Sequence, residues 1–148
     1  MKKNALILPC SSCGVKNRVP VQRLHDGPKC GSCGAFLSVE IWGRPVDVSD
    51  ADFQQEVMEA DLPVLVDCWA PWCGPCRVVA PVLDLVAEQY RGRVKVVKLN
   101  MDENPVTGGR LSISSIPTLL FVKGGDVVDT LMGVQSKEQI DKVLERIL

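Results

Sequence analysis

The chain has 148 residues, of which 46% are hydrophobic and 24% charged, and its formal net charge is −1. This composition indicates an ordinary soluble globular protein, and the length allows one full domain plus a small additional unit. Residues 1–45 carry seven Lys or Arg and two acids, a balance of +5, whereas residues 46–148 carry ten and sixteen, a balance of −6. The split predicts two units with different surfaces. It leaves no large basic field of the kind that binds nucleic acid.

The first ten residues contain only a weak export-like pattern. Lys2 and Lys3 precede four apolar residues, 5–8, which end at Pro9. An export signal needs roughly 7–15 apolar residues, and no run elsewhere approaches the ~20 residues that span a membrane. We therefore expect a cytoplasmic chain with no membrane partner. In a reducing compartment, its seven cysteines indicate metal binding or redox catalysis, not a disulfide framework.

A Cys-x-x-Cys-Gly motif occurs twice in the N-terminal part, with sixteen residues between the last cysteine of the first copy and the first cysteine of the second. That spacing is in the range of a four-cysteine zinc site, and four thiolates make a complete tetrahedral set for one structural zinc. The glycine after each pair permits a left-handed turn, so that main-chain N–H groups can point at the thiolates. His25, the single histidine, is the less favoured alternative ligand, because four cysteines are already present. The expected zinc ligands are Cys10, Cys13, Cys30 and Cys33.

Short strands at 18–21 and 35–39, with a turn at 26–28, complete a zinc-ribbon-like domain over residues 1–42. A segment of about 35 residues cannot bury enough apolar surface to be stable alone, so a metal is physically reasonable. Gly43-Arg44-Pro45 marks the predicted boundary.

A second domain, residues 46–148, is predicted to alternate strands and helices. A strand at 46–48 precedes a helix that starts at Ser49, with Asp52 in an approximate capping box. The near-continuous apolar run at 64–70 is typical of a buried central strand, and apolar residues at helical spacing after Cys76 predict a helix interrupted at Pro81. The order βαβαβαββα gives an α/β fold, a mixed sheet with helices on both faces. The other predicted elements are a strand at 94–101, a short helix at 104–110 weakened by Gly108-Gly109, a hairpin of 118–122 with 127–131, and a last helix capped by Ser136 and Gln139.

Cys73 and Cys76 lie between the apolar run and the helical pattern. Their spacing lets both sulfurs converge at the start of one helix, where they can pair, ligate a metal or exchange disulfides. The helix N-terminus stabilises a thiolate, so Cys73 is the candidate nucleophile and Cys76, expected to be more buried, the resolving thiol. The alternative is half of a metal site. Trp72, the intervening Gly-Pro and the four better-placed upstream cysteines argue against it.

The segment Asp-Cys-Trp-Ala-Pro-Trp-Cys-Gly-Pro-Cys at 67–76 closely resembles the active site of thioredoxins. Lys-Leu-Asn-Met-Asp at 98–102, Ile-Pro-Thr at 116–118 and Gly133 extend the resemblance over residues 46–148. Because these motifs follow two N-terminal cysteine pairs, the whole chain is similar to the zinc-containing bacterial thioredoxin-2 subgroup. The resemblance implies a thioredoxin fold behind a zinc ribbon. It also implies a protein-disulfide reductase that acts on disulfide-containing proteins and is recycled by an NADPH-dependent flavoprotein reductase.

The resemblance also implies roles for single residues. Asp67 is expected beneath the active site, where it accepts the proton of Cys76, with Lys98 as its partner on the neighbouring strand. The alternative is a structural ion pair, because a buried carboxylate needs a partner or a proton. Pro117 is expected in the cis form, facing the dithiol, so that adjacent backbone pairs with substrate; a trans proline starting a strand is the alternative. Cys68 is interpreted as a small buried hydrophobe.

The remaining expectations concern substrate binding and redox direction. The uncharged Gly-Pro pair implies a reductant, because oxidising relatives carry a histidine before the second cysteine. Trp69 is expected to shield the dithiol or simply to fill the core, and a turn role is the alternative for Gly133. A competing function is an adaptor that binds protein or nucleic acid through the ribbon, with the second domain as a scaffold; the intact dithiol argues against it. The residues expected to contact substrate are Trp72, Gly74, Pro75, Ile116, Pro117 and Gly133.

Overall fold

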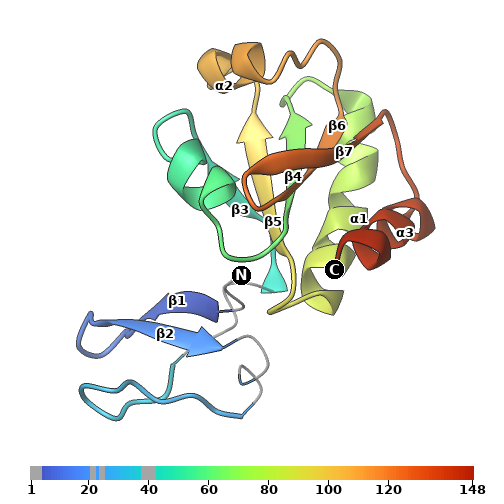
Figure 1. Cartoon of the computed structure of the whole chain (residues 1–148). Helices are drawn as coiled ribbons and strands as arrows, with labels where there is room; N and C mark the ends of the chain where they lie inside the picture. The colour runs from blue at the N-terminus through green and yellow to red at the C-terminus, as the bar shows by residue number, and fades with distance from the viewer. Residues whose placement is uncertain (1–4, 21–22, 24–25, 38–42) are drawn as a thin grey trace.

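The computed structural model describes residues 5–20, 23, 26–37 and 43–148. An N-terminal hairpin with two cysteine turns precedes a five-stranded sheet that carries helices (Figure 1). Figure 1 shows the hairpin near one end of this sheet and α2 near the opposite end. The elements are β1 (Ala5–Pro9), β2 (Lys16–Pro20), β3 (Val46–Val48), a π-helical turn (Gln54–Met58), β4 (Val64–Trp69), α1 (Gly74–Gln89), β5 (Lys95–Asn100), α2 (Pro105–Arg110), β6 (Thr118–Lys123), β7 (Asp126–Met132) and α3 (Lys137–Ile147).

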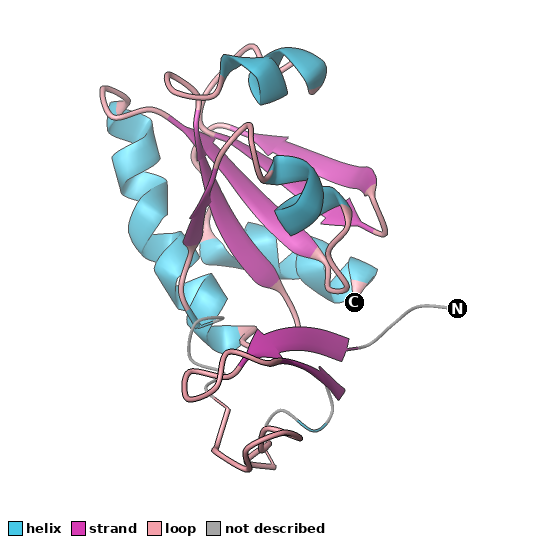
Figure 2. Ribbon diagram, turned by 90° about the vertical axis from the view of Figure 1, so that its left-hand side faces the viewer, coloured by secondary structure: helices cyan, strands magenta, loops and turns pink. Residues whose placement is uncertain are grey.

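The sheet has the strand order β3-β5-β4-β6-β7. β3, β5 and β4 run parallel, whereas β6 and β7 are antiparallel to their neighbours. β4 is central, and its uninterrupted apolar sequence fits a strand that is covered on both faces. This arrangement confirms the predicted mixed sheet with flanking helices (Figure 2).

Two apolar clusters, one on each face, hold the helices to the sheet. The cluster beneath α1 and α3 includes Leu65, Val79 and Ile140, all fully buried. The cluster on the other face includes Val57 and Val66. Because alternate residues of β4 point to opposite faces, Asp67 shares the α1 face with Leu65.

Three local expectations are corrected by the structure. The helix expected from Ser49 begins only at Gln54 and is π-helical; Asp52 accepts the Ser49 amide at 2.6 Å in the turn before it. Pro81 does not interrupt α1, which continues through it. Ala5–Pro9, which carried only the weak export-like pattern, is a strand that pairs with β2.

The strand expected at 35–39 is not formed over its described residues, 35–37. In place of the strand at 35–39, the described part contains an isolated bridge between Lys29 and Phe36. Val21, His25 and Val39, on which other expectations fell, lie outside the described residues.

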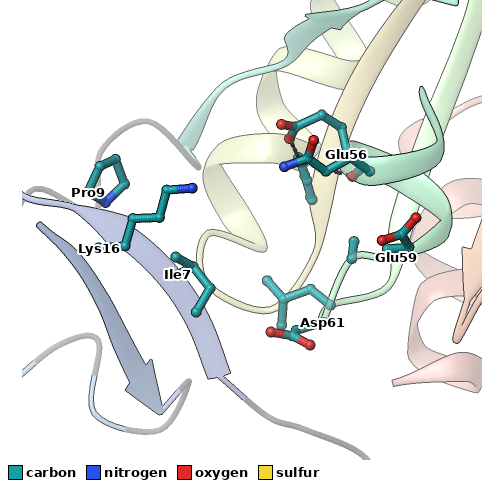
Figure 3. Close-up of a pocket in the computed structure, with 10 residues that line it drawn as sticks. Ile7, Pro9, Lys16, Glu56, Glu59 and Asp61 are labelled. Atoms are coloured by element: carbon teal, nitrogen blue, oxygen red, sulfur yellow. Dashed lines mark hydrogen bonds and ion pairs between the residues drawn. The ribbon is translucent and has the colours of Figure 1, made fainter. Parts of the chain in front are cut away.

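The hairpin contacts the rest of the chain through a small apolar cluster. Leu8, Val19 and two of the cysteines pack with Leu62, which lies just before β4. Beside this contact is a groove of about 530 Å³. Figure 3 shows Lys16 pointing across it toward Glu56, which accepts a 2.5 Å hydrogen bond from the nearly buried Lys95.

No helix in the described part of the chain is long and apolar enough to cross a membrane.

Candidate active site and metal centre

Cys73 and Cys76 form a disulfide at the N-terminus of α1. Cys73 is the N-cap residue, and its sulfur accepts the Cys76 amide at 3.2 Å. Gly74 and Pro75 occupy the first helical positions, where the absence of a proline N–H costs nothing. Cys76 was expected to be more buried than Cys73, but both are 3% exposed. In the disulfide each sulfur covers the other.

Asp67 lies on β4 beneath this disulfide. Its side chain is almost fully buried at 1% exposure, and neither carboxylate oxygen has a hydrogen-bond partner among the described residues. Burial raises the pKa of Asp67 to about 6, although the Lys98 ammonium acts to lower it. The group therefore titrates near neutrality.

A cavity of about 90 Å³ connects this carboxyl group to the dithiol. Asp67, Cys76, Trp69 and Lys98 line it together. Lys98 is the register partner of Asp67 on β5, and its ammonium lies over the Trp69 ring, 4.6 Å from the centroid. The structure thus brings together Asp67 and Cys76, the residues expected to act as proton acceptor and resolving thiol, with space between them for a water molecule.

Trp72 flanks the dithiol on the exposed side. Its indole is 69% exposed, and Nε1 donates to the carboxylate of Asp102 at 3.0 Å. Ile116 packs on the cluster that contains both cysteines, and its peptide bond to Pro117 is cis. The Gly133 amide donates to the Pro117 carbonyl at 2.8 Å.

Gly133 has a φ of +83°, a conformation that a side chain disfavours. Gly133 therefore lies in a turn and also contacts Pro117. Met132 and Val134 beside it are also exposed. Trp72, next to the dithiol, is a third exposed apolar side chain.

Cys68 points to the other side of β4 and is fully buried. Burial raises the pKa of its thiol to about 12, helped by the charge of Asp67. A buried thiol with a raised pKa carries little thiolate at neutral pH, which agrees with the expected role of Cys68 as a small buried hydrophobe.

The four N-terminal cysteines converge, with all sulfurs within 4.8 Å of one another. The sulfurs of Cys10 and Cys33, and those of Cys13 and Cys30, are 3.6 Å apart. A tetrahedral zinc with Zn–S bonds of about 2.3 Å places its sulfurs about 3.8 Å apart. The donor set and its spacing therefore fit zinc.

The two cysteine turns share one backbone design. Gly14 donates to the carbonyl of Cys10 and Gly34 to that of Cys30, each at 2.9 Å, and both glycines have a φ near +78°. N–H groups of Cys33 and Ser32 lower the pKa of Cys30 to about 6. The backbone thus favours the thiolate form that a metal requires.

Comparison with known proteins agrees with both parts of this description. Residues 44–146 match the thioredoxin family model. The chain belongs to the thioredoxin family. Residues 9–35 match a second model, that of the N-terminal region of thioredoxin 2, so this thioredoxin carries the zinc-ribbon region that its cysteine pairs predicted.

Several curated thioredoxins are similar to the chain. A thioredoxin from Synechocystis is 56% identical over 101 residues, covering 68% of this chain and 94% of the relative. A thioredoxin from Pseudomonas aeruginosa is 52% identical over 100 residues, covering 68% and 93%. Thioredoxin M4 of Arabidopsis thaliana chloroplasts is 44% identical over 144 residues, covering 97% and 72%. This family membership and the paired cysteines make the chain a thiol-disulfide oxidoreductase.

Two residues of the site were missed by the sequence analysis. Asp102 appeared there only as the end of a motif, without a role. Asn100, whose side chain accepts the Asp102 amide at 3.0 Å, likewise appeared only inside that motif, without a role. The pattern offered no signal for either contact, because both depend on how the chain turns after β5.

Proposed function

We propose that the protein is a protein-disulfide reductase in which Cys73 is the nucleophile and Cys76 the resolving thiol. The observation that carries this assignment is the shared cavity of Asp67 and Cys76 beneath a dithiol at a helix N-terminus. The helix N-terminus favours the Cys73 thiolate, and the carboxylate below provides a base for Cys76.

The reaction has two exchanges. The Cys73 thiolate attacks a substrate disulfide, forming a mixed disulfide and releasing the first substrate thiolate. Cys76 then gives its proton to Asp67 and attacks the Cys73 sulfur, which releases the second substrate thiolate. The substrate gains two electrons, and the enzyme is left with the Cys73–Cys76 disulfide. A flavoprotein reductase using NADPH would return both electrons.

Substrate binding is assigned to the apolar surface around the dithiol. Trp72 and Ile116 would contact the substrate, and backbone next to cis-Pro117 would pair with it as an added strand. Gly74 and Pro75 leave the helix start uncrowded, since a Cβ at Gly74 would meet no atom within 4 Å. A Cβ at Gly133 would likewise meet no atom within 4 Å.

The ribbon is proposed to hold one structural zinc through its four cysteines, in a separate domain that ends before residues 43–45. When bound, zinc supplies a tetrahedral cross-link between the two cysteine turns. The chain's own residues supply the thiolates and the backbone N–H groups around them. The dithiol is at the N-terminus of α1, and that end of α1 lies away from the N-terminal hairpin in Figure 1, which fits a structural role.

Reduction of insulin disulfides tests the proposed activity. The full chain should accelerate precipitation of reduced insulin in dithiothreitol, and a Cys73→Ser variant should not. With NADPH and a thioredoxin reductase in place of dithiothreitol, NADPH should be oxidised in step with insulin reduction. A wild-type chain that gives no acceleration over dithiothreitol alone would contradict the proposal and favour the adaptor function.

A further inference from the structure

Three charged residues form one row across the parallel part of the sheet. The register pairs Asp47 of β3 with Lys98 of β5, and the same Lys98 with Asp67 of β4. Register partners on adjacent parallel strands point to the same face. Lys98 therefore has a carboxylate on each side, one of which, Asp67, is the proposed proton acceptor.

The two carboxylates differ in their access to water. Asp47 is exposed on the edge strand, Lys98 is half-buried, and Asp67 is buried at 1% exposure. Lys98 and Trp69 both line the cavity that reaches Cys76. They also line an outer pocket of about 480 Å³. The ammonium, stacked on the indole, is thus at the partition between an inner and an outer space.

The outer pocket is acidic. Asp47, Asp52 and Glu103 line it, and Lys98 is its only basic lining residue among those described. Asp52 is already engaged by the amide and hydroxyl of Ser49. On the inner side, α1 contributes Cys76 and Arg77 to the cavity lining, and the Arg77 guanidinium donates to the Pro71 carbonyl at 2.9 Å.

We propose that Asp47 is a positioning residue for this site: its carboxylate draws the Lys98 ammonium toward the outer pocket and thereby limits the charge that reaches Asp67. This inference rests on the proposed role of Asp67 as the proton acceptor. Asp47 does not touch the dithiol. It acts through Lys98, whose flexible side chain reaches both spaces.

The sign of the effect follows from the charges. Drawing the ammonium outward withdraws a stabilising charge from the Asp67 carboxylate, so the pKa of Asp67 rises. Asp47 also repels Asp67 directly, which acts in the same direction. Neutralising Asp47 should therefore lower the pKa of Asp67. At two strand spacings, about 10 Å, direct repulsion alone corresponds to about 0.3–1 pH unit, depending on how strongly water screens it.

The test is a direct titration of the Asp67 carboxyl by carbon-13 NMR, on the oxidised full chain loaded with zinc. The Asp67 midpoint should fall by about 0.5 pH unit or more in Asp47→Asn, and it should stay within 0.2 pH unit of wild type in Asp47→Glu, which keeps the charge. Asp126→Asn, at the start of β7 on the opposite edge of the sheet from β3, is the matched control for loss of one exposed carboxylate. An unchanged midpoint in Asp47→Asn, or an equal shift in Asp126→Asn, would overturn the inference.

The path through Lys98 is tested in a Lys98→Met background. There the shift caused by Asp47→Asn should be smaller than in the wild-type background, because the mobile charge is gone and only direct repulsion remains. A shift of the same size would show that Asp47 does not act by positioning Lys98. Kinetics of Asp67→Asn test the proton-acceptor role separately. If that variant reduced insulin at the wild-type rate, the proposed function of Asp67 would fail while the NMR result on Asp47 still stood.

Discussion

Trp72 and Asp102 are joined by a hydrogen bond at the mouth of the active site, although thirty residues separate them in the chain. The bond restrains a large indole that is otherwise 69% exposed. Asp102 is itself held by the Asn100 side chain at the end of β5. The turn that follows β5 thus orients a residue assigned to substrate contact.

Replacing Asp102 with Ala should weaken the use of protein substrates. Loss of an exposed hydrogen bond to a charged acceptor corresponds to about 1 kcal/mol, or a roughly fivefold lower kcat/KM for insulin, expressed mainly in KM. A small aromatic disulfide needs no extended contact with the indole, so its rate should change little. Asp126→Ala serves as the control. An equal loss with both substrates would place the effect in the chemistry and not in binding.

The buried Asp67 carboxyl should lower the stability of the protein at neutral pH. Its pKa is raised to about 6 in the folded state, against about 3.9 when unfolded. The unfolded state therefore loses its proton first, and the free energy of unfolding falls as pH rises from about 4 to about 6. Asp67→Asn removes this penalty, which is at most about 3 kcal/mol at pH 8.

Urea denaturation of the oxidised protein measures this difference. Asp67→Asn should be more stable than wild type at pH 8, and the gain should shrink to about 0.5 kcal/mol at pH 4 and toward zero near pH 3, where Asp67 is protonated in both states. Asp84→Asn, an exposed carboxyl on α1, is the matched control and should show no such trend. A gain that does not vary with pH would mean that the charge of Asp67 is not its cause.

The same substitution should slow catalysis. Without a base in the cavity, Cys76 loses its proton less readily, so reduction at pH 7 should fall by about 10–100-fold. The loss should diminish at higher pH, where the thiol ionises without help. Stopped-flow reduction of insulin between pH 5 and pH 9 gives the profile. A profile that keeps its wild-type shape would reduce Asp67 to a structural residue.

The two active-site cysteines should fail in different ways. Cys73→Ser should abolish reduction because no nucleophile remains. Cys76→Ser should attack substrate and then stop as a mixed disulfide, since only the resolving step is lost. Mass spectrometry of the variant after incubation with a disulfide-containing protein would detect the covalent adduct. Normal turnover by Cys76→Ser would show that the two roles had been wrongly assigned.

Sequence patterns predicted those parts of the structure that local chemistry determines. The strand β4, the start of α1 at the dithiol and the cap of α3 follow from an apolar run, a cysteine spacing and a Ser–Gln pair. The structure contains the full capping box at Ser136 and Gln139. Its four ribbon sulfurs also converge, as their repeated motif had indicated.

What sequence did not predict depends on contacts between distant segments. β1 is stable as a strand only because β2 pairs with it, and its own five residues carry no alternation that indicates this. The place of Asp47 beside Lys98 depends on the register of a three-residue edge strand. The cavity between Asp67 and Cys76 forms only when α1 packs on the sheet. No periodicity along the chain encodes these relations.

The ribbon should bind one zinc per chain and lose it on oxidation, while the dithiol keeps its activity. Ligated thiolates remain oxidisable, so peroxide should convert the four cysteines to disulfides and release the metal. The Leu62 contact would then loosen, but the sheet has its own two apolar clusters and should remain folded.

Metal analysis should find about one zinc before peroxide treatment and almost none after it. A zinc-binding dye would follow the release in real time, and insulin reduction after re-reduction would report on the dithiol. Cys10→Ser, which removes one ligand, should weaken zinc binding without abolishing reduction, whereas Cys68→Ser should leave zinc content unchanged. A metal-free chain in which all four ribbon thiols titrate freely would refute the zinc assignment and, with it, the response to oxidants.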